Sequence, residues 1–157
     1  MVALTVIGVG SRLRGDDAIG PLLIDALSKQ TNSQIELVDA GSDALGILEY
    51  FQGREHVIVV DACKMGREAG CIEKIDPTRI NLVLQDDPVS LHGLGLAEAI
   101  KMGESLNMLP EDLKIIGIEP ESIQFNSSLS APVQGALKMA VKIVHDELDR
   151  VKQLAEA

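Results

Sequence analysis

The chain has 157 residues, 46% of them hydrophobic, which suits one ordinary domain with a full core. Its net charge of −10 disfavours nucleic acid and anionic membranes as partners, because both carry negative charge. Two Phe, one Tyr and no Trp leave the core to aliphatic side chains. No apolar run approaches the roughly 20 residues of a spanning helix, and the first residues lack a signal-peptide pattern. We expect a single cytoplasmic domain over residues 1–157, without membrane insertion.

The first half of the chain predicts strands alternating with helices. Residues 3–9 form a continuous apolar run, as expected for a central strand covered on both faces. A helix opens near Gly20 and Pro21, where apolar residues recur at helical spacing. Residues 35–38 predict a second strand, after which Asp43 caps a short helix, and residues 57–60 predict a third strand.

The second half predicts an antiparallel strand. Only ten residues, 61–70, separate the third strand from a fourth apolar run at 71–75, which is too short for a helical crossover. We therefore expect the fourth strand to run antiparallel to the third. A long loop over 78–95, a helix from Leu96, a last strand over 113–118 and a long helix from Ser130 follow. Together these elements predict a three-layer α/β/α sandwich.

Acidic residues follow four of the predicted strands. Ligands of parallel sheets bind outside the carboxyl ends of the strands, so side chains at this edge are candidates for a site. The acidic residues there are Asp16 and Asp17 after the first strand, Asp39 after the second, Asp61 after the third and Glu119 after the last. Such crowded carboxylates repel one another unless a cation or protons offset them, which favours a cation site.

Each of these residues also has a structural alternative. An N-cap for the helix near Ile19 accounts for one of Asp16 and Asp17 but not for both. Capping is an open alternative for Asp16, while we expect Asp17 to be exposed to the cleft at the strand ends. For Asp61, solvation of a turn after an apolar strand is an alternative to a ligand role.

His92 is the one histidine with a site-like context. It lies in the long loop between Leu91 and Leu94, and long loops in compact domains are usually functional or disordered. His56 and His145 fit surface or hydrogen-bonding roles. Two carboxylates with one imidazole would form an open, oxygen-rich site suited to a divalent transition metal.

The other motifs in the sequence do not indicate a redox, zinc, dinucleotide or serine-hydrolase site. Cys63 and Cys71 fit neither a CxxC pair nor a zinc site, so we expect both to be buried free thiols. Gly8 and Gly10 resemble the start of a dinucleotide fingerprint, but position 13 is Leu and the aspartates that follow would repel phosphate. The sequence contains neither HExxH nor GxSxG.

Taken together, the motifs resemble those of the hydrogenase maturation endopeptidases. They are GVGSRLRGDDAIG at the start, VDAG, VIVVDAC, the His92 loop, GIEPESI and LSAPV, and they span nearly the whole chain. The resemblance implies a phosphorylase/hydrolase-like fold, with a five-stranded mixed sheet of order 2-1-3-5-4 whose fourth strand is antiparallel. It also implies removal of a C-terminal extension from the large-subunit precursor of a nickel-iron hydrogenase, after nickel insertion.

By this resemblance, Asp17, Asp61 and His92 are the metal ligands and catalytic residues, and Asp39 and Gly41 bind substrate. The nickel would be carried by the precursor, although other divalent metals can occupy such a site. The partner would be the nickel-loaded precursor. A non-catalytic metallochaperone or checkpoint binder of that precursor is the alternative function.

The first motif departs from the usual family pattern at two positions. Ser11 stands where the family has Asn, and Ala18 stands where it has Gly. Ser11 keeps a hydroxyl but loses the amide, and Ala18 excludes a conformation that only glycine would accept.

Overall fold

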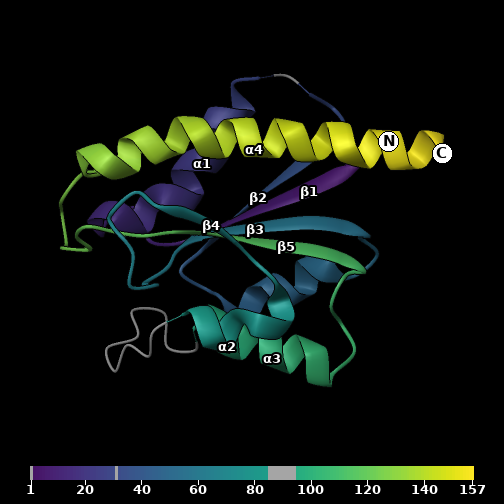
Figure 1. The fold of residues 1–157 in the computed structure, drawn as a ribbon, viewed down its shortest axis with the longest axis horizontal. Coiled ribbons are helices and arrows are strands. Elements are labelled where there is room, and N and C mark those ends of the chain that lie inside the picture. The colour runs from purple at the N-terminus through teal and green to yellow at the C-terminus, as the bar shows by residue number, and fades with distance from the viewer. Residues whose placement is uncertain (1, 31, 85–94) are drawn as a thin grey trace.

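The structure, a computed structural model, describes residues 2–30, 32–84 and 95–157. Helices cover both faces of a central sheet, seen nearly edge-on in Figure 1, which confirms the predicted three-layer α/β/α sandwich. The sheet contains β1 (Leu4–Val9), β2 (Ile35–Gly41), β3 (His56–Ala62), β4 (Ile72–Ile75) and β5 (Asp112–Ile118).

The order of the strands is β2-β1-β3-β5-β4, as the resemblance implied. β1 pairs in parallel with both β2 and β3, and β3 pairs in parallel with β5. β4 pairs antiparallel with β5, and so runs against β3 as the short connection predicted. The parallel strands therefore present their carboxyl ends at one edge of the sheet.

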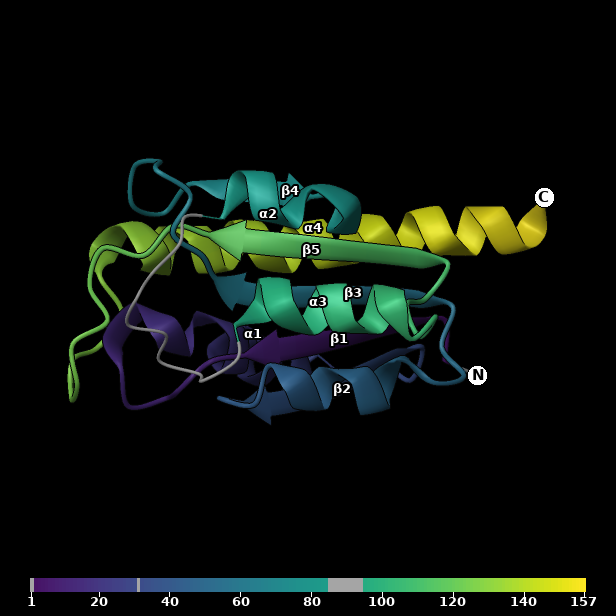
Figure 2. The ribbon, with the colours of Figure 1, turned by 90° about the horizontal axis from the view of Figure 1, so that it is seen from below.

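The helices divide between the two faces of the sheet (Figures 1 and 2). One face carries α1 (Ile19–Ser28) and the long α4 (Ala131–Glu156). The opposite face carries η2 (Leu45–Phe51), α2 (Ile80–Val83) and α3 (Leu96–Ser105). Two short 3₁₀ turns, η1 (Gly15–Ala18) and η3 (Pro77–Arg79), precede α1 and α2.

The strand β1 explains why the core has two halves. All six of its residues are buried. Ile7 and Val9 face the core beneath η2, α2 and α3, whereas Leu4 and Val6 face the core beneath α1 and α4. Because side chains alternate across a strand, a continuous apolar run fills both layers at once.

Two local predictions need correction, at segment 78–83 and at Asp39. The segment 78–83, expected to be loop, forms most of η3 and all of α2, and the Asp76 side chain accepts a hydrogen bond from the Thr78 N–H. The short helix predicted after Asp43 is confirmed as the 3₁₀ helix η2, and Asp43 accepts a hydrogen bond from the Gly46 N–H at 2.9 Å. β2 continues to Gly41, so Asp39 lies within this strand instead of following it.

The glycines of the first motif allow close packing at the carboxyl edge. A Cβ on Gly8 would lie 2.4 Å from the Gly20 carbonyl oxygen, so α1 begins directly against β1. Gly10 has φ +144°, and a Cβ there would lie 1.8 Å from the carbonyl oxygen of Asp17. Both positions therefore require glycine for packing.

Buried Asp16 joins three segments at this edge. Its carboxylate accepts hydrogen bonds from the N–H groups of Glu121 (2.8 Å), Ser122 (3.1 Å) and Ser130 (2.7 Å), and from the Ser130 hydroxyl at 2.8 Å. Its own N–H donates to the Ser122 carbonyl at 2.9 Å. Neither η1 nor α1 has a side-chain cap, so the capping alternative for Asp16 is wrong. Asp16 instead fastens the start of α4 and the loop after β5 to the loop after β1.

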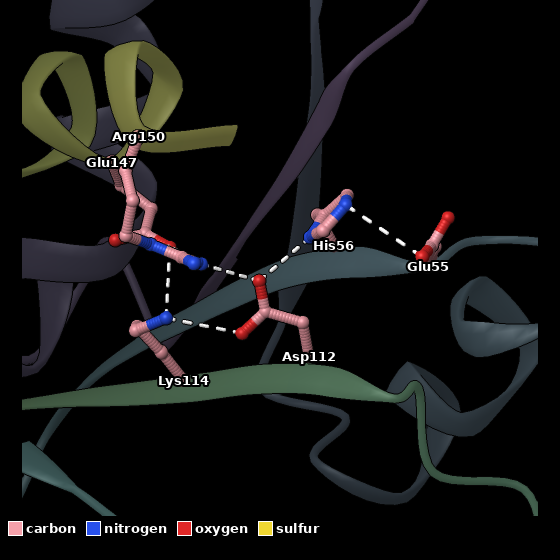
Figure 3. A network of polar contacts seen from close by, with 6 residues as sticks. All are labelled: Glu55, His56, Asp112, Lys114, Glu147 and Arg150. Carbon is pink, nitrogen blue, oxygen red and sulfur yellow. Dashed lines mark hydrogen bonds and ion pairs between the residues drawn. The ribbon is translucent and has the colours of Figure 1, made fainter. Parts of the chain in front are cut away.

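A polar network closes the opposite, amino edge of the sheet (Figure 3). Asp112 accepts hydrogen bonds from Lys114 at 3.0 Å and from Arg150, and it lies 2.6 Å from the His56 Nδ1. Lys114 also donates to Glu147 at 2.8 Å. The network ties α4 to β3 and β5, and it confirms a hydrogen-bonding role for His56.

His145 also has the structural role predicted for it. Its Nε2 pairs with the side-chain oxygen of Gln30 beyond the end of α1.

Replacing Asp16 with Ala should destabilise the protein by about 2–4 kcal/mol, because each buried donor left without an acceptor costs about 1–3 kcal/mol. Urea unfolding at pH 7 measures this loss. Asp43→Ala, which removes a single exposed contact to Gly46, is the control and should cost about 1 kcal/mol. Equal losses for the two variants would contradict the central role of Asp16.

The Asp112 network should make stability depend on pH. Burial raises the pKa of Asp112, but hydrogen bonds from His56, Lys114 and Arg150 outweigh it and hold the pKa below its ordinary 3.8. The unfolded chain therefore binds protons at a higher pH than the folded protein does. This contribution is complete above about pH 5 and is lost as the pH falls through the folded-state pKa.

We expect Asp112→Asn to lower the free energy of unfolding by about 1–3 kcal/mol at pH 7, and by less at pH 3. Urea unfolding at both pH values gives the comparison. Asp146→Asn, which removes an exposed ion pair with Lys142, should change stability by less than about 0.5 kcal/mol. A deficit of Asp112→Asn that is the same at pH 3 and pH 7 would refute the assignment.

Candidate active site

The carboxyl edge of the sheet brings Asp17 and Asp61 into the same region. Asp17 lies in η1, and Asp61 is the next-to-last residue of β3. η1 packs against β3, and β1 pairs with β3 up to Gly8 opposite Val60. Both carboxylates are buried, so Asp17 is not exposed to a cleft at the strand ends as the sequence predicted.

The thiol of Cys63 lies within the field of three carboxylates. Burial raises the pKa of Cys63 well above its ordinary value, and the charges of Asp61, Glu119 and Asp17 raise it further. Cys63 is a free, buried thiol as predicted, whereas Cys71 is free but only partly buried. The region is therefore strongly negative, which favours cations and disfavours anions.

Backbone contacts hold Asp17 in place. Its carboxylate accepts a hydrogen bond from the Ser11 N–H at 2.8 Å, and the Ser11 hydroxyl accepts from the Leu13 N–H at 3.2 Å. Because the contact to Asp17 uses the main chain, it does not depend on an amide side chain at position 11. Ala18 has φ −74°, which any residue can adopt. Neither departure from the family pattern therefore disturbs the described geometry.

Glu119 and Asp16 have structural roles. The Glu119 carboxylate is buried and accepts hydrogen bonds from the N–H groups of Met65 and Arg67, each at 2.8 Å. Asp16 is likewise held by backbone donors. Backbone donors therefore account for the burial of Asp16 and Glu119, and Asp17 and Asp61 are the buried acidic residues to which the sequence assigned a ligand role.

The predicted substrate-binding residues lie at the end of β2. Asp39 is exposed and pairs with Arg12 at 2.8 Å, and the same guanidinium binds Asp25 at 2.6 Å. Gly41 has φ +59° and accepts the Gly10 N–H at 2.7 Å through its carbonyl oxygen. Sequence reasoning gave Arg12 no role, because its partners lie 13 and 27 residues away.

His92 lies outside the described residues, so its place as third ligand stays a prediction. In residues 2–30, 32–84 and 95–157, no group of three His, Cys, Asp or Glu side chains has the geometry of a metal site. The carboxylates of Asp17 and Asp61 are hard oxygen donors of the kind that divalent ions bind, and as metal ligands they stay a prediction.

No helix in the described parts of the chain is both long enough and apolar enough to cross a membrane. The cytoplasmic location expected from the sequence stays a prediction.

Comparison with protein families gives one clear match. The family model described as hydrogenase maturation protease matches residues 21–147. The matched stretch includes Asp61, Cys63 and Glu119, while Asp16 and Asp17 precede it. Most of the chain is therefore covered.

Individual relatives agree with this match. The hydrogenase 2 maturation protease of Escherichia coli is 27% identical, over 90% of this chain and 87% of its own. The hydrogenase expression/formation protein HupD of Rhizobium leguminosarum is 25% identical, over 88% of this chain and 70% of its own.

Solved structures share the fold. The hydrogenase maturating endopeptidase HybD from E. coli superposes with a TM-score of 0.80 at 25% identity, covering 96% of this chain and 93% of its own. A hydrogenase 2 maturation peptidase from a Thaumarchaeota archaeon gives 0.68 at 29% identity, covering 92% and 97%. The chain belongs to the hydrogenase maturation protease family, and it is a peptidase.

Proposed function

We propose that this peptidase removes the C-terminal extension of a nickel-iron hydrogenase large-subunit precursor, and that it does so only after nickel insertion. Family membership supports the reaction class. The observation that carries the nickel dependence is the pair Asp17 and Asp61, two buried carboxylates of which one lies in η1 and the other near the carboxyl end of β3, against which η1 packs. In this proposal nickel belongs to the substrate and arrives with the precursor.

Electrostatics supports recognition of a cation. Ionised carboxylates that share a buried region repel one another, and a divalent ion placed between them offsets this repulsion. The charges of Asp17 and Asp61, with that of Glu119, already raise the pKa of Cys63. Nickel-loaded precursor would therefore bind more tightly than nickel-free precursor.

Asp17 and Asp61 would contact the nickel of the precursor, with His92 as the third contact. Imidazole is the softer ligand among hard carboxylates, and it favours nickel over magnesium or calcium. The remaining positions of the ion would keep the ligands that the precursor supplies. Docking would thus depend on the loaded metal.

Cleavage is a hydrolysis. A water oxygen attacks the scissile carbonyl carbon, the C–N bond breaks, and the released amine takes up a proton. The docked ion can polarise the carbonyl or activate the water, and a site carboxylate can accept the proton that the water loses. Both routes need the same contacts to Asp17 and Asp61.

Asp17→Asn, Asp61→Asn and His92→Ala should each lower the cleavage rate of nickel-loaded precursor by about 100-fold or more, since single electrostatic contacts in active sites contribute 10²–10³. An amide keeps the shape of Asp but loses its charge. Mass spectrometry of the large subunit measures the loss of the extension. His145→Ala is the control and should cleave normally, because His145 lies on α4 and pairs with Gln30.

Cleavage by His92→Ala at the parent rate would show that the ligand assignment is wrong. A parent protein that binds nickel-loaded precursor without shortening it would instead be a checkpoint binder.

Nickel should be required on the substrate rather than on the enzyme. We expect chelator-treated enzyme to cleave nickel-loaded precursor at the untreated rate, and to leave nickel-free precursor intact. The free protein should contain little metal, because an open site with few ligands binds modestly. Equal cleavage of both precursors, or stoichiometric metal that resists chelators, would overturn the nickel requirement.

A further inference from the structure

Two large apolar side chains are exposed beside the candidate active site. Leu13 is 57% exposed and Phe125 is 58% exposed, although the chain has only two Phe. The loops that carry them are joined, since the Asn126 N–H donates to the Leu13 carbonyl at 2.7 Å. Exposed apolar groups gathered at one place commonly mark a binding surface.

Local contacts hold Phe125 in this exposed position. Asn126 adopts φ +63°, which is uncommon for a residue with a side chain. The Ser127 hydroxyl donates to the Gln124 carbonyl at 2.6 Å, and the Ser122 hydroxyl accepts from the Gln124 N–H at 3.3 Å. The exposed ring therefore belongs to a built turn, and positive φ at a residue other than glycine is often associated with function.

A cation completes this surface. The guanidinium of Arg14 lies over the Phe125 ring, 5.7 Å from its centre. Among the residues that the structure describes, Arg14 forms no ion pair with a carboxylate. In a chain of net charge −10, this is a local positive group that can bind a carboxylate from a partner. We name Leu13, Arg14 and Phe125 the loop ridge.

The loop ridge is anchored to the segment that carries Asp17. Leu13 and Arg14 stand on the loop that carries Asp16 and Asp17, and Phe125 stands on the loop after β5. The buried carboxylate of Asp16 fastens the two loops together. Both loops lie at the carboxyl edge of the sheet in Figures 1 and 2.

We propose that the loop ridge binds the C-terminal extension of the precursor. Apolar side chains of the extension would pack against Leu13 and Phe125, and a carboxylate of the extension would pair with Arg14. The inference rests on the proposed function. An extension that is removed from the carboxyl end of a chain carries a terminal carboxylate, which complements the charge of Arg14. Binding there would hold the peptide beside Asp17 while the nickel is recognised.

Steady-state cleavage of nickel-loaded precursor tests the apolar contacts. We expect Leu13→Ser and Phe125→Ser to raise KM about five- to tenfold with kcat within twofold, because contacts kept through the reaction act on KM alone. Phe125→Leu should retain most of the parent KM. Leu106→Ser is the matched control, since Leu106 is 59% exposed at the far end of α3 and should leave KM unchanged.

The charge is tested separately. Arg14→Gln should raise KM about fivefold and weaken its dependence on salt, whereas Arg14→Lys should keep that dependence. A precursor without its extension should bind to the parent and to Phe125→Ser with equal affinity. Thermal melting of each variant shows that the fold is intact.

Unchanged KM values for Leu13→Ser, Phe125→Ser and Arg14→Gln would overturn the inference while leaving the peptidase intact. If the parent cleaves no precursor, the proposed function fails first, and precursor affinity becomes the test of the loop ridge. Lower affinity for these three variants but not for Leu106→Ser would then support the surface. Equal affinity would reject it.

Discussion

The carboxylate of Asp16 is the contact on which the carboxyl edge of the sheet depends. It accepts hydrogen bonds from Glu121, Ser122 and Ser130, which lie 105, 106 and 114 residues further along the chain. A buried carboxylate is stable only when its oxygens are satisfied, and here three segments meet to satisfy it. Since Asp16 precedes Asp17 directly, the contacts that anchor one aspartate also fix the position of the next.

The buried acidic residues at this edge fall into two pairs, one with a structural role and one that we propose contacts nickel. Asp16 and Glu119 accept several backbone N–H groups each, so they stabilise loops. Asp17, which accepts the Ser11 N–H, lies in η1, and Asp61 lies near the carboxyl end of β3; the charges of both raise the pKa of Cys63. A rigid frame built by the first pair would let the second pair meet a metal ion with little rearrangement, which is how preorganised sites gain selectivity.

Much of the fold could be predicted because its signals are local. β1 and β3 are apolar runs, and the short connection after Asp61 was enough to make β4 antiparallel. The helical turn of α2 was missed because four residues carry too little periodicity. The role of Asp16 could not be predicted, since its partners are far away in the sequence and no local pattern reveals them. The positions of Asp17 after β1 and of Asp61 near the end of β3 could be predicted from the apolar runs before them, whereas the loop ridge depends on a turn that packs against a distant loop.

Nickel K-edge X-ray absorption tests most directly whether Asp17 and Asp61 contact the metal of the substrate. Spectra would be recorded for nickel-loaded precursor alone and after mixing with the parent protein, freeze-quenched before cleavage. If Asp17 and Asp61 bind the nickel, we expect added oxygen or nitrogen ligands on nickel with the parent protein, and fewer of them with Asp17→Asn or Asp61→Asn. A nickel spectrum that does not change on binding, from a mixture that goes on to cleave the precursor, would contradict it.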